Sequence, residues 1–398
     1  MADISSSKRI DWIDYARVIS IILIIIAHAH YLSIRTAFGG IPTQQSDILF
    51  SAIGSSPYFY YANKVIYELL STFRLPLLFL ISGIVYSLSR KKRTITELAR
   101  IKFKRLIIPF IFSTLFLSVP IKYICGYFDE STDLIRDIVC GHILLMSNSH
   151  LWFLVTLFVI FIIYHAIDRI LKSISINASG RQSIIIIIGA CMLFISGIMP
   201  ELLAIDQLFH YFIFFSIGAS PVTFSIIEKK NLPKNLPWLI VGSYWIIFAI
   251  LVISYKNFIS HPGIIDTGSG TMFIIEQIFC IIWGIAGAYG SILVAKAIAS
   301  NKRISNNPAI RLVKDNSFKL YRYSDPFNYL VIYISTTTGL LLISHPIGAP
   351  VYCVVRFLVT IIAPILIILV QRYLRNRTWI PSRILFAFPF KRNSTDAR

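Results

Sequence analysis

The chain has 398 residues, of which 56% are hydrophobic and only 14% are charged, whereas soluble domains carry about 25% charged residues. It still holds 38 Lys and Arg against 19 Asp and Glu, a formal net charge of +19. This combination excludes a disordered tail, a coiled coil and a soluble enzyme. Two explanations of the basic excess are left, a nucleic-acid partner or positive loops on the cytoplasmic side of a membrane protein.

Apolar runs of the length that crosses a bilayer, about 20 residues, recur along the whole chain. The first run has no small-residue cleavage site after it, so we interpret it as a signal-anchor helix. We predict an all-α integral membrane protein with one membrane domain over residues 1–375 and a basic cytoplasmic or interfacial tail over 376–398. The roughly ten predicted spanning helices are 13–33, 67–89, 104–123, 150–171, 183–200, 207–227, 237–255, 271–298, 327–345 and 350–372.

Lys and Arg are concentrated in alternate loops of this arrangement. About 30 of the 38 fall at the N-terminus, in the connections after the second, fourth, sixth and eighth helices, and in the C-terminal tail. The opposite loops are poor in Lys and Arg, and one of them is acidic (Asp129, Glu130, Asp133 and Asp137). Because basic loops stay in the cytoplasm, we predict cytoplasmic N- and C-termini, and this explanation replaces a nucleic-acid partner.

The first predicted helix carries ionisable groups along one face. Arg17 and His28 are eleven positions apart, which puts them on the same side of a helix about 16 Å from each other, with Asp14 one turn before Arg17. Since such groups usually face the bundle interior, one interpretation is a polar track with His28 as a proton-transfer group. The other makes Asp14 and Arg17 interfacial anchors and His28 a hydrogen-bonding partner of a neighbouring helix. His30 points to another side and is our second choice.

Three further basic residues have two interpretations each. Arg74 is predicted near the outer end of the second helix, where it either stabilises the negative charge that develops on a reacting carbonyl or snorkels to the interface. Lys102 and Arg105 are one turn apart at the start of the third helix. They either bind an anion such as a phosphate or serve the positive-inside topology, and their spacing alone favours topology.

Polar residues also precede the fourth and ninth predicted helices. His150 and Trp152 stand at the start of the fourth helix, where an aromatic interface belt is the default interpretation. Asp325 precedes Pro326 and the predicted ninth helix. It is either a functional carboxylate or the N-cap of that helix, and the Asp-Pro order favours the cap.

The five cysteines are scattered without a CxxC pair, and the histidines show no metal-ligand spacing, so we predict no metal site. Cys125 and Cys140 share an outer loop, where they either pair in an oxidising compartment or stay free.

Together these segments resemble the acyltransferase-3 family of integral-membrane O-acyltransferases, and within it the fucose 4-O-acetylase-like branch. No single segment is specific, but their order along the chain is that of the family. The matching segments are Arg9–Asp14 with Arg17 and His28, Leu75–Gly83, Lys102–Pro109, Leu151–Leu154 and Phe212–Gly218.

The resemblance implies an O-acetyltransferase whose first-helix histidine, His28, is the catalytic base or is transiently acylated. Arg17 and Asp14 would then line the path of the donor, and Arg74 would approach the reacting carbonyl from the outer side. The candidates for substrate contacts are His150, Trp152 and Asp325.

The resemblance also implies acetyl-CoA as the acyl donor, with Lys102 and Arg105 as ligands of its phosphates. It implies a bacterial cytoplasmic (inner) membrane location and an acceptor sugar on a lipid-linked glycan or a surface glycan such as an O-antigen or capsule. The chain departs from the family at Ser324, where a histidine is common, so that histidine is dispensable, Asp325 replaces it, or the activity is altered. The competing hypotheses are a polytopic transporter, although we see no internal repeat, and an inactive or accessory family member.

Overall fold

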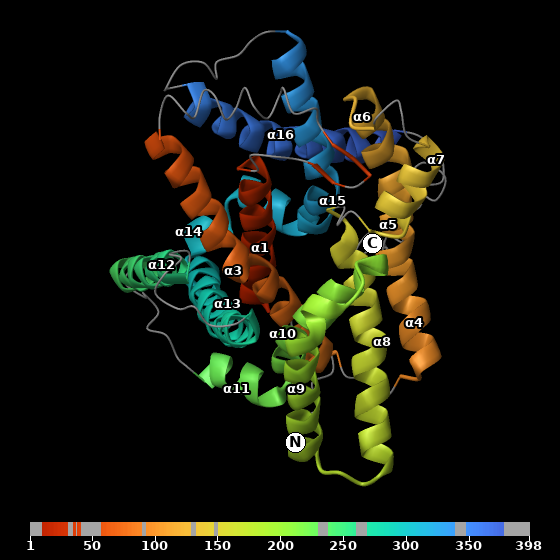
Figure 1. Cartoon of the computed structure of the whole chain (residues 1–398), viewed down its shortest axis with the longest axis vertical. Helices are drawn as coiled ribbons and strands as arrows, with labels where there is room; N and C mark the ends of the chain where they lie inside the picture. Colours follow the sequence, from red (N-terminus) through yellow and green to blue (C-terminus); the bar gives the residue numbers. More distant parts are fainter. Residues whose placement is uncertain are drawn as a thin grey trace, which may run out of the picture.

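The structure, a computed structural model, describes residues 10–30, 35–36, 38–40, 57–89, 93–128, 133–146, 150–229, 238–259, 269–338 and 348–377. Most of this part is helical, and the long helices pack into one bundle (Figure 1). They are α1 (Asp11–Ala29), α3 (Pro57–Leu88), α4 (Ile95–Lys102), α8 (Trp152–Ser173), α9 (Ala178–Ile195), α10 (Ile205–Ala219), α12 (Trp238–Ile259), α13 (Ser269–Ser300), α15 (Pro308–Thr337) and α16 (Gly348–Arg377).

Short elements complete the described part. The strands β1 (Arg35–Thr36) and β2 (Gly39–Gly40) pair antiparallel. The short helices are α5 (Ile108–Ser113), α6 (Val119–Ile124), α7 (Leu134–Arg136), α11 (Pro221–Lys229) and α14 (Lys302–Ser305), with π-helical turns η1 (Phe103–Ile107), η2 (Thr114–Ser118) and η3 (Asp137–Ile143) and 3-10 turns η4 (Ser196–Ile198) and η5 (Leu202–Ala204).

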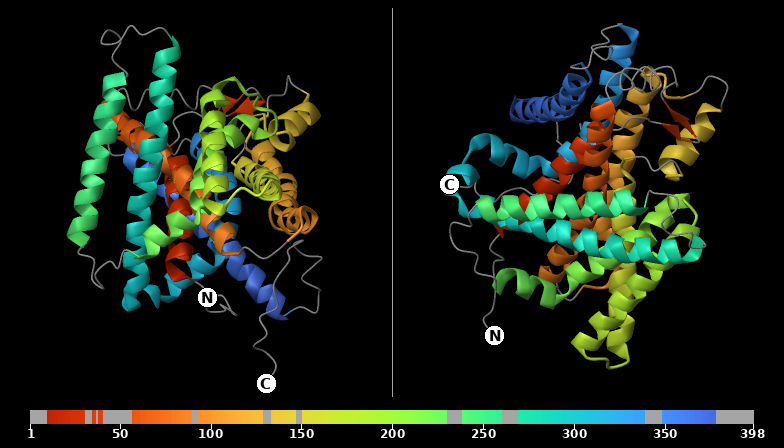
Figure 2. Two further views of the ribbon diagram at one scale, coloured as in Figure 1. Left: turned by 90° about the horizontal axis from the view of Figure 1, so that it is seen from below. Right: turned by 60° about the vertical axis from the view of Figure 1, so that its left-hand side comes forward.

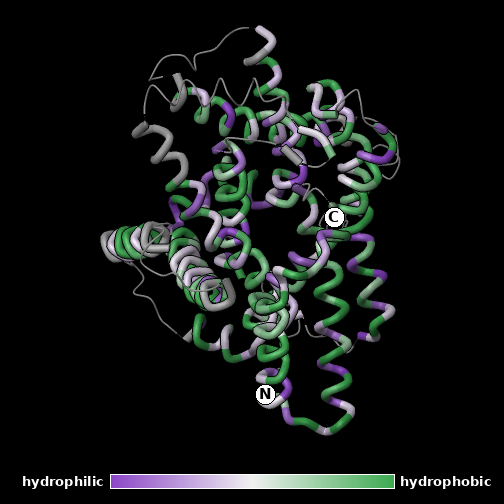
Figure 3. The backbone as a smooth tube through the Cα atoms, viewed as in Figure 1, coloured by the Kyte–Doolittle hydropathy of each residue, from purple (hydrophilic) through white to green (hydrophobic). Residues whose placement is uncertain are grey.

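Among the described residues, eight helical segments are long and apolar enough to cross a membrane, and Figure 3 shows hydrophobic residues along most of the helical trace. This confirms an all-α integral membrane protein. The predicted segments at 237–255 and 327–345 overlap α12 and α15, which fall outside that group. The exact number of spans and the cytoplasmic termini stay predictions. The eight segments are Asp11–Ala29, Val65–Leu88, Ile95–Ile124, Trp152–Ser173, Ala178–Ile198, Leu202–Ala219, Phe273–Ser300 and Val351–Tyr373.

Some predictions concern residues beyond the described part. These are the first helix after residue 30, the acidic residues Asp129 and Glu130, the ninth helix after residue 338 and the basic tail from residue 378 onwards. None of the five cysteines forms a disulfide in the structure, so Cys125 and Cys140 do not pair with each other there.

Helix α3 begins at Pro57, ten residues before the predicted start. Arg74 is therefore near the middle of the 32-residue helix, whereas the apolar span within it, Val65–Leu88, begins two residues before the predicted start. The place of Arg74 near the outer end of the span stays a prediction. The apolar run alone located only the second part of this helix, because the segment before it is more polar.

Helix α15 begins at Pro308, with Asn307 as its N-cap, whose side chain accepts from the Ala309 amide at 2.9 Å. Asp325 and Pro326 lie inside this helix, so the interpretation of Asp325 as an N-cap is wrong. Hydropathy missed the first half of α15 because charged residues are frequent there.

The third predicted span is one helical path, from α4 through η1, α5 and η2 to α6. Thr94 starts it with a capping box, in which Thr94 and Glu97 satisfy each other's amides. Pro109 and Pro120 each follow a π-helical turn. A proline ring clashes with the carbonyl four residues before it, and a wider turn relieves the clash. The first of these turns carries Lys104 and Arg105.

Helix α3 packs against α1, α10 and α13. The crossing with α10 is tight, because a methyl group added to Gly218 would lie 2.0 Å from the Leu80 carbonyl oxygen, and one on Gly83 would lie 2.2 Å from that of Phe215. Small residues allow this approach of two backbones. Helices α12 and α13 lie side by side at one edge of the bundle (Figure 2).

Connections that we predict to share the cytoplasmic side meet in the structure. The Tyr15 hydroxyl donates to the Ser305 carbonyl at 3.3 Å, and Trp12 Nε1 donates to Glu228 Oε2 at 3.2 Å. These contacts join the start of α1 to α14 and to the end of α11. We call this end of the bundle the basic end.

Candidate active site

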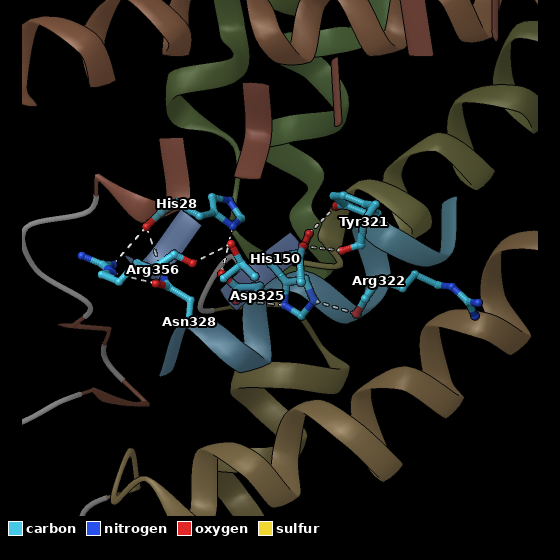
Figure 4. A network of polar contacts seen from close by, with 9 residues as sticks. His28, His150, Tyr321, Arg322, Asp325, Asn328 and Arg356 are labelled. Carbon is cyan, nitrogen blue, oxygen red and sulfur yellow. Dashed lines mark hydrogen bonds and ion pairs between the residues drawn. The ribbon is translucent and has the colours of Figure 1, made fainter. Parts of the chain in front are cut away.

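One buried carboxylate contacts two histidines from distant parts of the chain (Figure 4). His28 Nδ1, in the last turn of α1, lies 2.9 Å from Asp325 Oδ1 of α15. His150 Nδ1, just before α8, lies 3.3 Å from Asp325 Oδ2. The side chains of Asp325 and His150 are only 6% and 2% exposed. We call these three residues the histidine–aspartate cluster.

The contact at Nδ1 determines what the His28 ring can do. A carboxylate accepts from an Nδ1–H, and in a neutral imidazole the opposite nitrogen, Nε2, then carries the lone pair. Asp325 also stabilises the imidazolium that forms when Nε2 takes a proton. The arrangement is that of a histidine base oriented by a carboxylate.

The backbone of His28 is held as well as its side chain. Asn328 Nδ2 and Arg356 Nη2 donate to the His28 carbonyl oxygen at 3.2 and 3.1 Å, and Arg356 Nε donates to Asn328 Oδ1 at 2.8 Å. Asp325 and Asn328 are three positions apart and so share a face of α15. Helix α15 thus holds both the ring and the carbonyl of His28, and α16 contributes Arg356 at the carbonyl.

Sequence reasoning missed Asn328 and Arg356. A signal for the second was available, because an arginine within an apolar run faces the bundle interior and marks a functional site by default. Arg356 is only 1% exposed.

His150 is positioned by the turn of α15 that precedes Asp325. The Tyr321 hydroxyl donates to the His150 carbonyl, and His150 Nε2 lies 3.5 Å from the Arg322 carbonyl oxygen. Burial lowers the pKa of His150 to about 4. The ring is therefore neutral at neutral pH with one hydrogen to donate. Its Nε2 bonds with the Arg322 carbonyl, whereas its Nδ1 forms no hydrogen bond within the described part of the chain.

A cavity of about 720 Å³ lies between α1, α3, η1, α8 and α15. Its walls combine apolar side chains with six cations, and no Asp or Glu is among its lining residues. Phe153, Tyr321 and Arg322 are among its lining residues, and the last two contact His150. We call it the inner cavity, and its cations are Arg17, Lys102, Lys104, Arg105, Lys319 and Arg322.

Two of these cations have informative partners. Arg17 Nη1 lies 3.2 Å from Asp14 Oδ1, so the pair predicted along α1 forms. Lys102 Nζ lies 3.3 Å from the centroid of the Phe161 ring, a cation–π contact. A cavity with this excess of positive charge fits an anionic ligand with an apolar portion.

The predicted residues therefore fall into two neighbouring groups and a remainder. Arg17, Lys102 and Arg105 share the inner cavity, while His28, His150 and Asp325 form the cluster. Three predicted residues lie outside both groups. They are Asp14, which pairs with Arg17, Arg74 and Trp152.

Arg74 and Trp152 are in neither group. Arg74 is buried, its guanidinium is 5.5 Å from the Tyr67 ring centroid, and its Nε and Nη1 have no hydrogen-bond partner in the described part of the chain. Trp152 stacks on Phe79 and Tyr211 in the core. Their roles at the carbonyl and the substrate stay predictions. Within the described ranges, no group of three or more His, Cys, Asp or Glu residues could hold a metal ion.

A family model described as an acyltransferase domain matches residues 10–369 of the chain. The matched range includes the whole histidine–aspartate cluster and the whole inner cavity. No curated protein and no solved structure matches the chain.

Proposed function

Because the chain belongs to the acyltransferase-3 family and is a membrane acyltransferase, we propose that it moves an acetyl or other short acyl group from cytoplasmic acyl-CoA to a sugar hydroxyl of a surface or lipid-linked glycan. The observation that carries this proposal is the adjacency of a cation-lined cavity to a histidine oriented by a carboxylate. We place the protein in a bacterial inner membrane, with the basic end in the cytoplasm.

The donor enters the inner cavity from the basic end. Guanidinium and ammonium groups of Arg17, Lys102 and Arg105 hold the diphosphate of the coenzyme by charge-assisted hydrogen bonds. The pantetheine arm then follows the apolar wall, which includes Leu157 and Phe153. Its thioester arrives beside Tyr321 and Arg322, next to the cluster.

His28 performs the proton transfer. Its Nε2 takes the proton of the acceptor hydroxyl, whose oxygen attacks the thioester carbonyl carbon. When the C–S bond breaks, the coenzyme leaves as a thiol with the proton that His28 returns. Asp325 stabilises the imidazolium meanwhile, and it takes the place of the family histidine whose position Ser324 occupies. Ser324 itself donates to the Tyr321 carbonyl at 3.2 Å.

The test is transfer of radiolabelled acetyl groups from acetyl-CoA to host glycan lipids by the purified protein in vesicles. We expect His28→Ala to lower the rate by about 10²- to 10⁴-fold, as for loss of a general base. Lys102→Gln with Arg105→Gln should raise the KM for acetyl-CoA roughly 10- to 100-fold. His30→Ala is the matched control, because His30 is two residues away and bonds to the Ile26 carbonyl instead.

Wild-type transfer by His28→Ala at an equal amount of protein would exclude the proposed base. A covalent acyl-histidine, trapped on His28 when acceptor is withheld, would replace direct transfer by a two-step mechanism at the same residue. Movement of label across the vesicle without any ester on the glycan would support a transporter instead, and neither transfer nor flux would support an inactive or accessory member.

A further inference from the structure

A second cavity, of about 760 Å³, opens at the basic end of the bundle. It is lined by Tyr86 and Ser89 at the end of α3, by Arg93 and Leu98 at the start of α4, and by the end of α8 and the start of α9. Four cations line it, Arg93, Arg169, Lys172 and Arg181, against the single carboxylate of Asp168. Asp168 is already paired with Arg181 Nε at 3.1 Å. The side chains that line this outer cavity therefore carry three more positive charges than negative ones.

The outer cavity continues the inner cavity along the same helix faces. On α8, the inner cavity is lined by Phe153, Leu157 and Phe161, and the outer one by His165 and then Asp168, Arg169 and Lys172. These positions follow each other in steps of three and four residues, which keeps them on one face.

Helices α3 and α4 repeat this order. On α3, Ser82 and Val85 line the inner cavity, and Ser89, directly after the end of α3, lines the outer one. On α4, Lys102 belongs to the inner cavity and Leu98, one turn nearer the basic end, to the outer one. Three helices therefore lead from one cavity to the other.

The outer cavity has an ordered wall. His165 Nδ1 bonds with the Tyr86 hydroxyl at 2.7 Å, and His165 Nε2 lies 3.2 Å from the Arg93 carbonyl oxygen. Arg169 also donates to that carbonyl. These contacts fix the turn before α4 against α8. A set of basic residues needed only for topology requires no such fixed wall, whereas a ligand site does.

Coenzyme A carries its negative charge in two places, the diphosphate and the separate 3′-phosphate of the ribose. The thioester end lies farthest from both. With the thioester near the cluster and the diphosphate in the inner cavity, the ribose is the part that reaches the basic end. We propose that the outer cavity binds the ribose 3′-phosphate and so selects coenzyme A over analogues without that group, an inference that rests on the proposed function.

The experiment compares acetyl-CoA with acetyl-3′-dephospho-CoA as donors. The wild-type protein should prefer acetyl-CoA in kcat/KM by about 10- to 100-fold, as expected for one or two charge-assisted hydrogen bonds. The double variant Arg169→Gln, Lys172→Gln should lose this preference by losing rate with acetyl-CoA only. The control variant Lys302→Gln, Arg303→Gln removes two exposed charges from α14 at the same end and should keep the preference.

Equal use of both donors by the wild-type protein would overturn the proposal, as would equal losses with both donors in the double variant. A loss of preference in the control variant would also overturn it, because the effect would then be one of overall charge. The same comparison by equilibrium binding of coenzyme A and dephospho-coenzyme A in neutral detergent separates the two proposals. Binding without transfer contradicts the proposed function alone. If added phosphatidylglycerol abolishes the preference, the cavity is a lipid headgroup site and the assignment to the coenzyme is wrong.

Discussion

Replacing Asp325 by asparagine tests the central feature of the site. The substitution keeps the size of the side chain but removes the negative charge that lies 2.9 Å from His28 Nδ1. At this separation, with an effective dielectric constant of about 20, the attraction between the carboxylate and an imidazolium is roughly 6 kcal/mol. That stabilisation acts only when His28 has taken the proton, so it belongs to the transition state and not to donor binding.

We therefore expect Asp325→Asn to lower kcat by about 10⁴-fold and to leave the KM for acetyl-CoA within about twofold. The second expectation follows because Asp325 is not among the residues that line the inner cavity. The assay is the vesicle transfer reaction at varied acetyl-CoA, with thermal unfolding in detergent as the measure of folding. Ser324→Ala, one residue before, is the matched control and should keep kcat within about twofold, since its hydroxyl bonds only to the helix backbone.

Two outcomes would refute this reasoning. A wild-type kcat for Asp325→Asn would show that the carboxylate does not assist His28. A raised KM with an unchanged kcat would show that Asp325 acts on ground-state binding.

Further predictions concern the support of the site and the fold. Arg356→Leu and Asn328→Ala should each lower kcat about 10- to 100-fold by releasing the His28 carbonyl. The double variant should lose little more than either single variant, because both residues act in one network. Additive losses in the transfer assay would contradict this. Gly218→Ala should destabilise the protein by about 1–3 kcal/mol, since the new methyl group meets the Leu80 carbonyl. Thermal unfolding measures this loss, with Gly242→Ala as control because a methyl group there meets no atom within 4 Å; equal midpoints for both variants would contradict the close crossing.

The parts of the fold that follow a local pattern could be predicted from the sequence. Hydropathy located the apolar helices, and helical periodicity placed Asp14 beside Arg17, which the structure confirms. The same periodicity predicted that Arg17 and His28 share one face of the helix, and in the structure the two residues have different partners. Arg17 lines the inner cavity, whereas His28 contacts Asp325.

What local patterns do not contain is the identity of distant partners. Asp325 is about 300 positions from His28, and its Asp-Pro sequence is more typical of a helix start than of a helix interior. Helix α15 instead begins at Pro308, and tertiary packing buries Asn316, Ser317 and Arg322 of its polar first half against the bundle. Similarly, the basic residues around 169–181 follow the positive-inside pattern, and only their common cavity separates a ligand site from topology.

Helices α1 and α15 each contribute to both steps of the proposed reaction, the binding of the donor and the proton transfer. Each helix has a cation in the inner cavity, Arg17 and Arg322, and each has a member of the cluster, His28 and Asp325. Because His28 and Asp325 contact each other, a shift of one helix along the other would break the cluster and alter the cavity together. The spacing between the phosphate-binding groups and the base is therefore set by the packing of two helices, not by a loop. A donor held at its phosphates then presents its thioester at one fixed depth, which is what an acyl transfer between a cytoplasmic donor and a membrane-bound acceptor requires.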